Sequence, residues 1–458
     1  MNRLDKGGRA RFGAMLLTLW LGIGVVGCNS LLDVDNPNNV IGDDILIPSA
    51  AQALANGALY EVSAGYTYTL MCYSQVSDET HWVGSRDAFQ QLDYGHIEYH
   101  LNEFTDQAYK DLAPGRWMAD KAIGILEGHL AEDSLPDEQS LGEAYMWGAL
   151  AYVTIADMFD DFTFSDMMVP QPAIGPANMG GLYTTAIGYL TSGLALDVND
   201  ETVRNLTAMR AEARHAQGVW NLIGQRPITT GLISAADAAA AATDAAAALA
   251  LDPSDWTYYL EYPSSGTYGD FQGDVNSRLE HRFGNRYIIP EAGDKRRDRT
   301  APNRGIRLMD PVDNVADMRL DAIMTPFEDG VQYSDLPILS AREMHLILAE
   351  DAMVRGDMAD FLTHINQPRA WGGLNDWTAA SGVSQEDILI HERQVNLFIQ
   401  GKRLNDMYRF GIESDQWEAS STAHSAPGTF FPITMAEIDA NCYINPNWPA
   451  DVSCPPGG

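Results

Sequence analysis

The chain has 458 residues, of which 45% are hydrophobic and 20% are charged. Its 63 acidic residues outnumber 29 lysines and arginines, which gives a formal net charge of −34 at pH 7. So acidic a surface repels phosphate backbones and anionic lipid, which excludes a nucleic-acid-binding function. The length and apolar fraction suffice for one large or two ordinary domains with a substantial core.

Residues 1–27 have the pattern of a secretory signal peptide. Four basic residues between positions 3 and 11 precede an apolar run, Gly13 to Gly27, that is too short to span a bilayer comfortably. The run ends in VVGC, which resembles a bacterial lipobox and implies cleavage before Cys28 and acylation of Cys28. The alternative is an ordinary signal peptide followed by an incidental cysteine. Acyl chains on Cys28 would supply membrane affinity, and more than one chain would give stable anchoring.

Residues 28–47 are polar and contain Pro37, which favours an extended tether after the lipid. No later segment approaches 18 uninterrupted apolar residues, so we expect no transmembrane helix in the mature chain. Export exposes the remaining cysteines to an oxidising compartment. Cys442 and Cys454 are close enough in sequence to form a disulfide or to stay free, whereas Cys72 is expected to be a buried free thiol.

Helical periodicity dominates the rest of the sequence and predicts a mainly α fold. In residues 137–159, apolar or small side chains recur at the spacing of a helix with one buried face, and small residues such as Gly148 would let a neighbouring helix approach closely. Similar patterns predict helices over 48–64, 105–130, 181–195, 201–224, 232–250, 340–355 and 385–410. The pair 201–224 and 232–250 has the size of a tetratricopeptide-like unit, although no repeat consensus is visible.

Residues 251–336 differ, because they are rich in Tyr, Gly, Pro, Asp and Arg and have no helical period. We expect long loops with a few short strands. A loop region of this length inside a compact domain is usually functional when it is ordered.

The most charged helical stretch contains Glu392, Arg393, Arg403, Asp406 and Arg409. These residues could be catalytic, but paired charges in a helix more often lock neighbouring helices together. Arg342 and Glu343 are likewise expected to make packing or ion-pair contacts. Because the apolar face changes register near Gly401, a kink or break is expected there.

Aromatic residues outside the helices are candidate ligand contacts, because sugar rings stack on aromatic faces while their hydroxyls need fixed hydrogen-bond partners. An exposed Trp82 in a loop, with His81 and neighbouring acids, offers both. The central insertion supplies a second group, consisting of Trp256, Tyr258, Tyr259, Tyr262 and Tyr268. The alternatives are a tryptophan that pins a loop and an ordinary alternating strand.

A calcium site is conceivable at Asp310, Asp313, Asn314 and Asp317, since oxygen ligands suit this ion. The spacing is irregular for a loop site, so turn capping or solvation is the competing interpretation. No other cofactor or metal is expected, because phosphate-loop, hydrolase, zinc and EF-hand patterns are absent from the sequence.

Four segments together resemble the SusD/RagB family of outer-membrane nutrient-binding lipoproteins. They are CNSLLDVDNPNNV, GEAYMWGALAYVTIADMFDDFTF, LPILSAREMHLILAEDAMVRGD, and HERQVNLFIQGKRLNDMYRFG followed by FFPITMAEIDANCYINPN. Each motif alone is weak, but the four occur in the family's order along the mature chain. The match is poorest in 251–336, where ligand specificity would vary in this family.

The resemblance implies a non-enzymatic protein with one tetratricopeptide-like helical domain over residues 48–458, interrupted by the insertion at about 251–336. It would be lipid-anchored on the outer face of the outer membrane. There it would deliver oligosaccharides, or in some members peptides, to a SusC-like TonB-dependent transporter. Two rival readings are a secreted glycoside hydrolase, which needs two carboxylates in a cleft, and a helical-repeat adaptor that binds proteins or peptides.

Overall fold

The computed structural model of the chain describes residues 45–166, 169–224, 228–449 and 451–454. The signal peptide, Cys28 and the tether up to residue 44 therefore lie outside the described residues. The chain divides into residues 1–50, which contain the short 3-10 helix η1 (Pro48–Ala50), and a larger unit of residues 51–458. Among the described helices, none combines the length and the apolarity that a membrane crossing requires.

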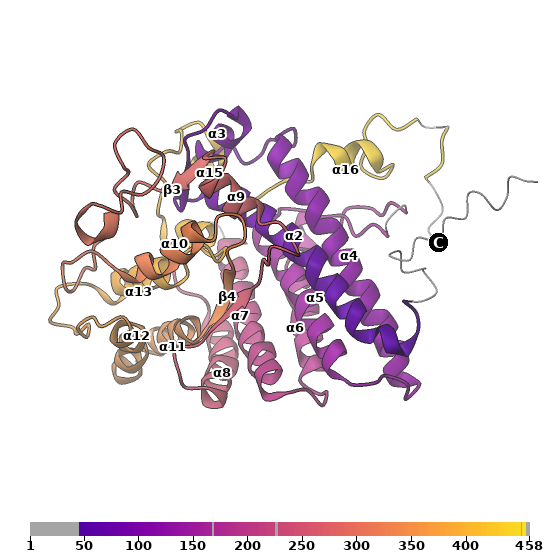
Figure 1. Ribbon diagram of the computed structural model, residues 1–458, viewed down its shortest axis with the longest axis horizontal. Coiled ribbons are helices and arrows are strands. Elements are labelled where there is room, and N and C mark those ends of the chain that lie inside the picture. Colours follow the sequence, from indigo (N-terminus) through magenta and orange to yellow (C-terminus); the bar gives the residue numbers. More distant parts are fainter. Residues whose placement is uncertain (1–44, 167–168, 225–227, 450, 455–458) are drawn as a thin grey trace, which may run out of the picture. The chain divides into compact units, whose positions relative to one another are not determined.

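The fold is mainly α, as the periodicity predicts. Its scaffold is a row of helices in which each packs against the next in sequence (Figure 1). In order, these helices are α2 (Ala51–Val76), α4 (Glu103–Ala131), α5 (Gln139–Met158), α6 (Gly181–Gly193), α7 (Asp200–Gly224), α8 (Ala235–Leu251), α11 (Ala341–Arg355) and α12 (Met358–Trp371). The predicted pair over 201–224 and 232–250 is thus confirmed as α7 and α8. The first helix is longer than predicted, ending at Val76 instead of 64.

Close helix packing in this row depends on small residues. A Cβ atom on Gly65 would lie 2.6 Å from the Cα of Leu112, and one on Gly115 would lie 2.9 Å from the backbone oxygen of Glu61. Only glycine therefore allows α2 and α4 to approach this closely. The alanine-rich α8 begins at Ser234, whose side chain accepts a hydrogen bond from the Asp237 N–H, a standard N-cap.

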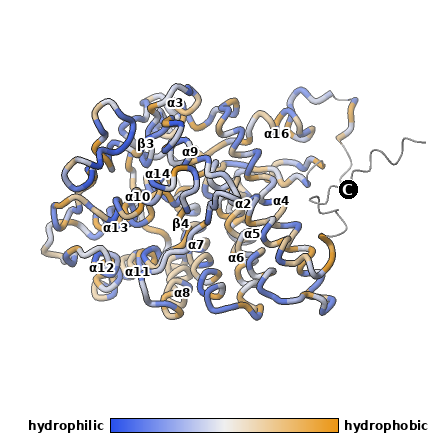
Figure 2. The backbone as a smooth tube through the Cα atoms, viewed as in Figure 1, coloured by the Kyte–Doolittle hydropathy of each residue, from blue (hydrophilic) through white to orange (hydrophobic). Residues whose placement is uncertain are grey.

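Helix α5 corrects one expectation. The periodicity predicts one buried face, but in the described structure every residue of α5 from 140 to 158 except Glu143 is buried. The reason is that α5 packs on α2, α4, α6 and α7 at once. Figure 2 shows the resulting contrast between the apolar colouring of the central helices and the hydrophilic connections of the insertion.

The central insertion holds more regular structure than expected. Besides the strands β2 (Thr257–Leu260) and β3 (His281–Phe283), it contains the helices α9 (Asp270–Asn276) and α10 (Arg319–Asp329) and the 3-10 helix η3 (Pro302–Gly305). The expectation of loops and strands alone is therefore wrong. Helix α10 escapes sequence reasoning because Pro326 lies inside it, although Leu320, Met324 and Phe327 occur at helical spacing on its buried face.

Two small antiparallel sheets connect the insertion to the helices. Strand β1 (Thr80–Trp82) pairs with β3, with His81 opposite Arg282. Strand β2 pairs with β4 (Leu336–Ser340), and the register shifts between Tyr258 and Tyr259. Both pairings join segments that are far apart in the sequence.

The break expected near Gly401 is confirmed. Helix α13 (Gln385–Asn396) ends before it and α14 (Arg403–Phe410) begins after it. Ile399 and Gly401 both have positive φ angles, of 55° and 72°, which turn the chain between the two helices.

The remaining elements are short and complete the chain. They are α3 (Asp87–Asp93), the 3-10 helix η2 (Pro176–Asn178), α15 (Thr422–Ser425) and α16 (Met435–Ala440). Cys442 and Cys454 form the disulfide that the sequence left open, with Cα atoms 5.6 Å apart, and Cys72 is a buried free thiol.

Candidate functional site

A cleft of about 240 Å³ lies between β2, β4, α10 and the segment that joins α13 to α14. Its apolar lining includes Tyr259, Ile323, Pro326 and Pro337. Tyr259 is 47% exposed, so a large part of its ring is available to a ligand. An exposed aromatic ring over a concave surface is a suitable platform for the apolar face of a small molecule.

The opposite side of the cleft is polar and tightly held. Arg342, near the start of α11, donates two hydrogen bonds to Asp255, at 2.9 and 2.7 Å. The same guanidinium donates to the side-chain oxygen of Asn396 at 3.1 Å. Gln400 donates a hydrogen bond to the backbone oxygen of Asn396, and its buried Oε1 has no hydrogen-bond partner. The cleft therefore offers a fixed cation at Arg342.

The backbone beside the cleft is strained. Ile399, a β-branched residue, has a φ of 55°, a conformation that such residues rarely adopt. Its N–H donates to the Glu79 side chain at 2.7 Å. Burial raises the pKa of Glu79 to about 7, although the hydrogen bond from Ile399 opposes this rise. Strain of this kind persists where the surroundings enforce it, and it concentrates at functional sites.

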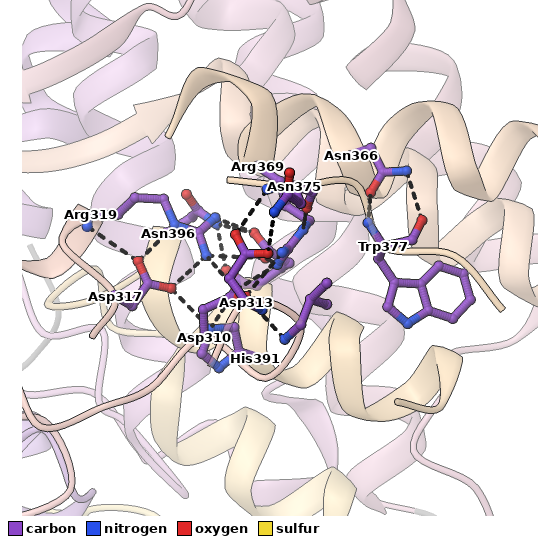
Figure 3. Close-up of polar contacts among 12 residues, drawn as sticks. Asp310, Asp313, Asp317, Arg319, Asn366, Arg369, Asn375, Trp377, His391 and Asn396 are labelled. Atoms are coloured by element: carbon purple, nitrogen blue, oxygen red, sulfur yellow. Dashed lines mark hydrogen bonds and ion pairs between the residues drawn. The ribbon is translucent and has the colours of Figure 1, made fainter. Parts of the chain in front are cut away.

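A buried ion network supports the floor of the cleft (Figure 3). Arg319 lines the cleft and pairs with Asp317 at 2.6 Å and with Glu392, while Arg369 bridges Glu392 at 2.8 Å and Asp310 at 2.6 Å. Burial by itself would raise the pKa of Asp317, but hydrogen bonds from Arg319 and His391 outweigh it and hold this pKa below its usual value. The network joins α10, α12 and α13, and thereby fixes the position of the cleft wall.

The charged stretch of α13 and α14 makes the contacts expected of a structural lock. Asp406 accepts hydrogen bonds from Arg393 at 2.9 Å and Arg409 at 2.8 Å. Arg409 also pairs with the fully buried Glu350 of α11, and Arg403 pairs with Asp78 after α2. These ion pairs connect distant helices.

His81 and Trp82 do not form the exposed loop site that the sequence predicts. His81 is 2% exposed and contacts Asp93 at 3.0 Å and Asp415 at 3.3 Å. Trp82 is half-buried in β1. The expectation fails because β1 pairs with β3, about 200 residues later, and no local pattern reveals that pairing.

Of the five aromatic candidates in the insertion, only Tyr259 lines the cleft. Trp256 is buried, donates its indole N–H to the Asp252 backbone oxygen and packs under the Arg204 guanidinium. Tyr258 stacks on Trp147, Tyr262 is fully buried, and Tyr268 is half-buried. The expectation that Trp256 and Tyr262 present exposed rings to a ligand is wrong, because both rings belong to the core. Sequence reasoning did not identify Asn396 and Gln400, which carry no signal apart from their place next to the break.

The acidic residues considered as calcium ligands are bonded to other side chains. Asp310 pairs with Arg369, Asp317 pairs with Arg319, and Asp313 accepts hydrogen bonds from Asn375. Asp310 also caps its own turn by accepting from the Asp313 N–H. Their oxygens are thus engaged with guanidinium and amide groups, and a calcium ion would have to displace these; calcium binding stays a prediction.

A second cavity, of about 260 Å³, lies between α4, residues 163–165 and α16. Trp117 forms part of its wall, and its indole N–H is bonded to Asp166. Glu437 accepts hydrogen bonds from Thr163 and Ser165. Because these polar groups already satisfy one another, this cavity offers fewer free partners than the cleft at Tyr259.

No protein-family model matches the sequence, and no curated protein matches it. Several solved structures share its fold. A SusD superfamily protein from Parabacteroides distasonis superposes with a TM-score of 0.62 at 11% identity and covers 86% of this chain and 97% of its own. A SusD homolog from Bacteroides thetaiotaomicron gives a TM-score of 0.60 at 13% identity, with 88% and 97% covered. A SusD-like carbohydrate binding protein from Bacteroides vulgatus gives 0.50 at 14% identity, with 80% and 84% covered.

Proposed function

We propose, from the SusD superfamily fold that this chain has, that it is a non-catalytic binding protein for nutrients, foremost oligosaccharides. A SusD-like carbohydrate binding protein among the structural neighbours supports the ligand class. The proposal extends to its cellular role, in which the protein is anchored at the cell surface through Cys28 and delivers ligand to a SusC-like TonB-dependent transporter.

One observation carries the ligand class, namely the exposed ring of Tyr259 in a cleft that polar side chains also line. The ring offers a stacking surface for the C–H face of a sugar, and the Arg342 guanidinium offers a donor for its hydroxyl groups. The Asp255–Arg342 pair fixes the guanidinium, so a bound sugar meets an already ordered partner.

Binding of purified residues 28–458 to a panel of neutral oligosaccharides, acidic oligosaccharides and short peptides tests the proposal. Tyr259→Ala is expected to weaken binding of the best ligand about 5-fold, because stacking contributes on the order of 1 kcal/mol, whereas Tyr259→Phe keeps most of the affinity. Trp117→Ala, which changes the other cavity, is the matched control and should bind normally. Full affinity in Tyr259→Ala would place the ligand elsewhere, and binding of peptides alone would favour the peptide-binding alternative.

The hydrolase alternative predicts turnover. The cleft carboxylates are Asp255, held by Arg342, and Asp335, whose side chain accepts from the Tyr262 N–H. A prolonged incubation of the protein with its best glycan ligand, followed by chromatography, is expected to return the glycan intact. Release of shorter fragments that persists after a further purification step would contradict the non-catalytic proposal.

The cellular part of the proposal rests on the lipobox-like sequence at Cys28. Mass spectrometry of the N-terminal peptide from native membranes should find an acylated Cys28, and Cys28→Ser should release the protein from the membrane fraction. Affinity purification from solubilised membranes should recover a TonB-dependent transporter as the main partner. A bare Cys28 in native membranes would remove the anchor from the proposal without affecting the ligand site.

A further inference from the structure

We infer that His345 and His364 form a binding site for one divalent transition-metal ion, of the Cu²⁺ or Ni²⁺ class. The two residues lie on α11 and α12 and do not line the Tyr259 cleft, although Asp255 of the cleft lies near His345. This site does not depend on the proposed sugar-binding function.

The geometry of the pair supports the inference directly. The two Nδ1 atoms are 2.9 Å apart, and the rings are partly exposed. Helices α11 and α12 are joined through Gly356, which takes a left-handed conformation, so they form a tight hairpin that holds the two rings together. The edge of Trp371 packs against His345, with ring centroids 5.2 Å apart, and further restricts that ring.

The spacing of the nitrogens indicates which metals would fit. Imidazole nitrogens bind such ions at about 2.0–2.1 Å. If two imidazole nitrogens 2.9 Å apart bind the same ion, the angle between the two nitrogens at the metal is about 90°. This is the angle between neighbouring ligands in square-planar and octahedral complexes. The tetrahedral geometry of zinc needs nitrogens about 3.3 Å apart, so zinc would require the rings to separate. Water would complete the coordination on the exposed side.

The tautomer of His364 is suited to binding through Nδ1. Its Nε2 lies 3.4 Å from Asp360, which favours a proton on Nε2 and leaves the Nδ1 lone pair free. A carboxylate behind the distal nitrogen is the usual arrangement around metal-bound histidines. Without metal, His345 donates its Nδ1 proton to His364. On metal binding this proton would move to Nε2 of His345, so that both rings bind the ion as neutral imidazoles through Nδ1.

Acidic side chains around the pair favour a bound cation. Asp255 faces His345, and Asp360 and Asp351 face His364, where Arg355 is the opposing cation. Arg355 is itself paired with Asp351, Asp357 and Asp360. A neutral ring is the form that binds metal.

Several other histidines in the described part of the chain face carboxylates instead of a second imidazole. His215 contacts Glu350, His391 contacts Asp317, and His424 contacts Glu413. Asp310, His391 and Glu392 also place ligand atoms within 4.8 Å of one another. That space is already bridged by Arg369, which donates to both carboxylates. The pair at His345 and His364 is therefore the stronger candidate.

Titration calorimetry of tag-free residues 28–458 with CuCl₂ and with NiCl₂ tests the inference. We expect one site, with an affinity at least 10-fold weaker in His345→Gln and in His364→Gln. His424→Gln, which removes a surface histidine elsewhere, should bind as the unchanged protein does. For Cu²⁺, pulsed electron paramagnetic resonance should detect coupling to two imidazoles, reduced to one in each single variant.

Circular dichroism first checks that each variant is folded. Folding is expected, because glutamine retains a polar group of similar size. Unchanged metal affinity in both single variants, or the absence of saturable binding at 100-fold molar excess of metal, would overturn the inference. The two histidine variants are expected to lose metal binding and to keep glycan binding. If the unchanged protein binds no glycan but still binds the metal, the metal-site inference is unaffected.

Discussion

Arg342 connects two walls of the cleft, since its guanidinium bonds both to Asp255 ahead of β2 and to Asn396 at the end of α13. Arg342→Ala is expected to weaken ligand binding about 10-fold or more, because it removes a charged donor and frees Asp255. The free energy of unfolding should change by no more than about 1 kcal/mol, since the ion pair is partly exposed. Calorimetry and urea unfolding measure the two effects separately.

Arg355→Ala provides the control on the same helix, because Arg355 pairs with acids at the far end of α11. It should leave glycan affinity unchanged. Equal losses of affinity in both variants would indicate a general disturbance of α11 and not a contact with the ligand.

For single residues, the sequence predicts what kind of contact a side chain makes better than it predicts which neighbours surround that side chain in the fold. Arg342 is expected to form an ion pair, and it does so with Asp255. Tyr259, by contrast, cannot be separated from Tyr262 by pattern, although one is half-exposed and the other fully buried. The difference depends on which helix covers each ring, and α2 covers Tyr262 by accepting its hydroxyl at the Ser63 backbone oxygen.

The break between α13 and α14 is the element that shapes the cleft, and Gly401 permits it. Gly401→Ala would place a side chain at φ 72° and bring its Cβ within 2.6 Å of the Met158 Cε atom. We expect a loss of about 1–2 kcal/mol in the free energy of unfolding, since left-handed backbone is unfavourable for alanine. Urea unfolding followed by circular dichroism measures it.

Gly188→Ala is the matched control. Gly188 lies in the helix α6 with open space around it, so alanine there should stabilise the protein by about 0.5–1 kcal/mol. A Gly401→Ala variant as stable as the unchanged protein would show that the break relaxes without strain.

Elements with strong local signals are the ones that sequence predicts well. The helices α4, α6, α7, α8 and α11 agree with their predicted ranges to within a few residues, and the register change marks the break at Gly401. The pairings of β1 with β3 and of β2 with β4 could not be predicted, because three- to five-residue strands acquire their stability from distant partners. The cleft lies between such elements, so most of its lining escaped prediction.

For the whole molecule, buried acids set the response of stability to pH. Burial raises the pKa of Glu79 to about 7, and burial together with the nearby Glu212 raises that of Glu343 to about 8. Burial opposes protonation of His81, but hydrogen bonds to Asp415 and Asp93 raise its pKa to about 9. All three groups bind protons more tightly in the folded state than in the unfolded state.

The sign of the effect follows from this difference. The unfolded chain loses the Glu79 and Glu343 protons above about pH 4.5 and the His81 proton above about pH 6.5, whereas the folded protein keeps them until about pH 7, 8 and 9. Folding stability therefore falls as pH rises through these three windows. Below pH 6.5 the buried neutral rings of His281 and His345, whose pKa values are lowered to about 3 and 4, act in the opposite direction. The net charge of −34 counts the histidines as neutral, so the charge is less negative where they are protonated, and self-repulsion is stronger at high pH. A stability maximum in mildly acidic solution is therefore expected.

Glu343→Gln tests the origin of this dependence, because glutamine mimics the protonated carboxyl. Thermal unfolding between pH 6.5 and 9 should show a falling melting temperature in the unchanged protein and a flatter profile in the variant. The variant should already be the more stable at pH 6.5, because unfolded Glu343 loses its proton above about pH 4.5, and its advantage should grow until about pH 8. Glu132→Gln removes the same charge from an exposed position and should leave the slope unchanged. If both variants flatten the profile equally, overall charge and not the burial of Glu343 governs how stability responds to pH.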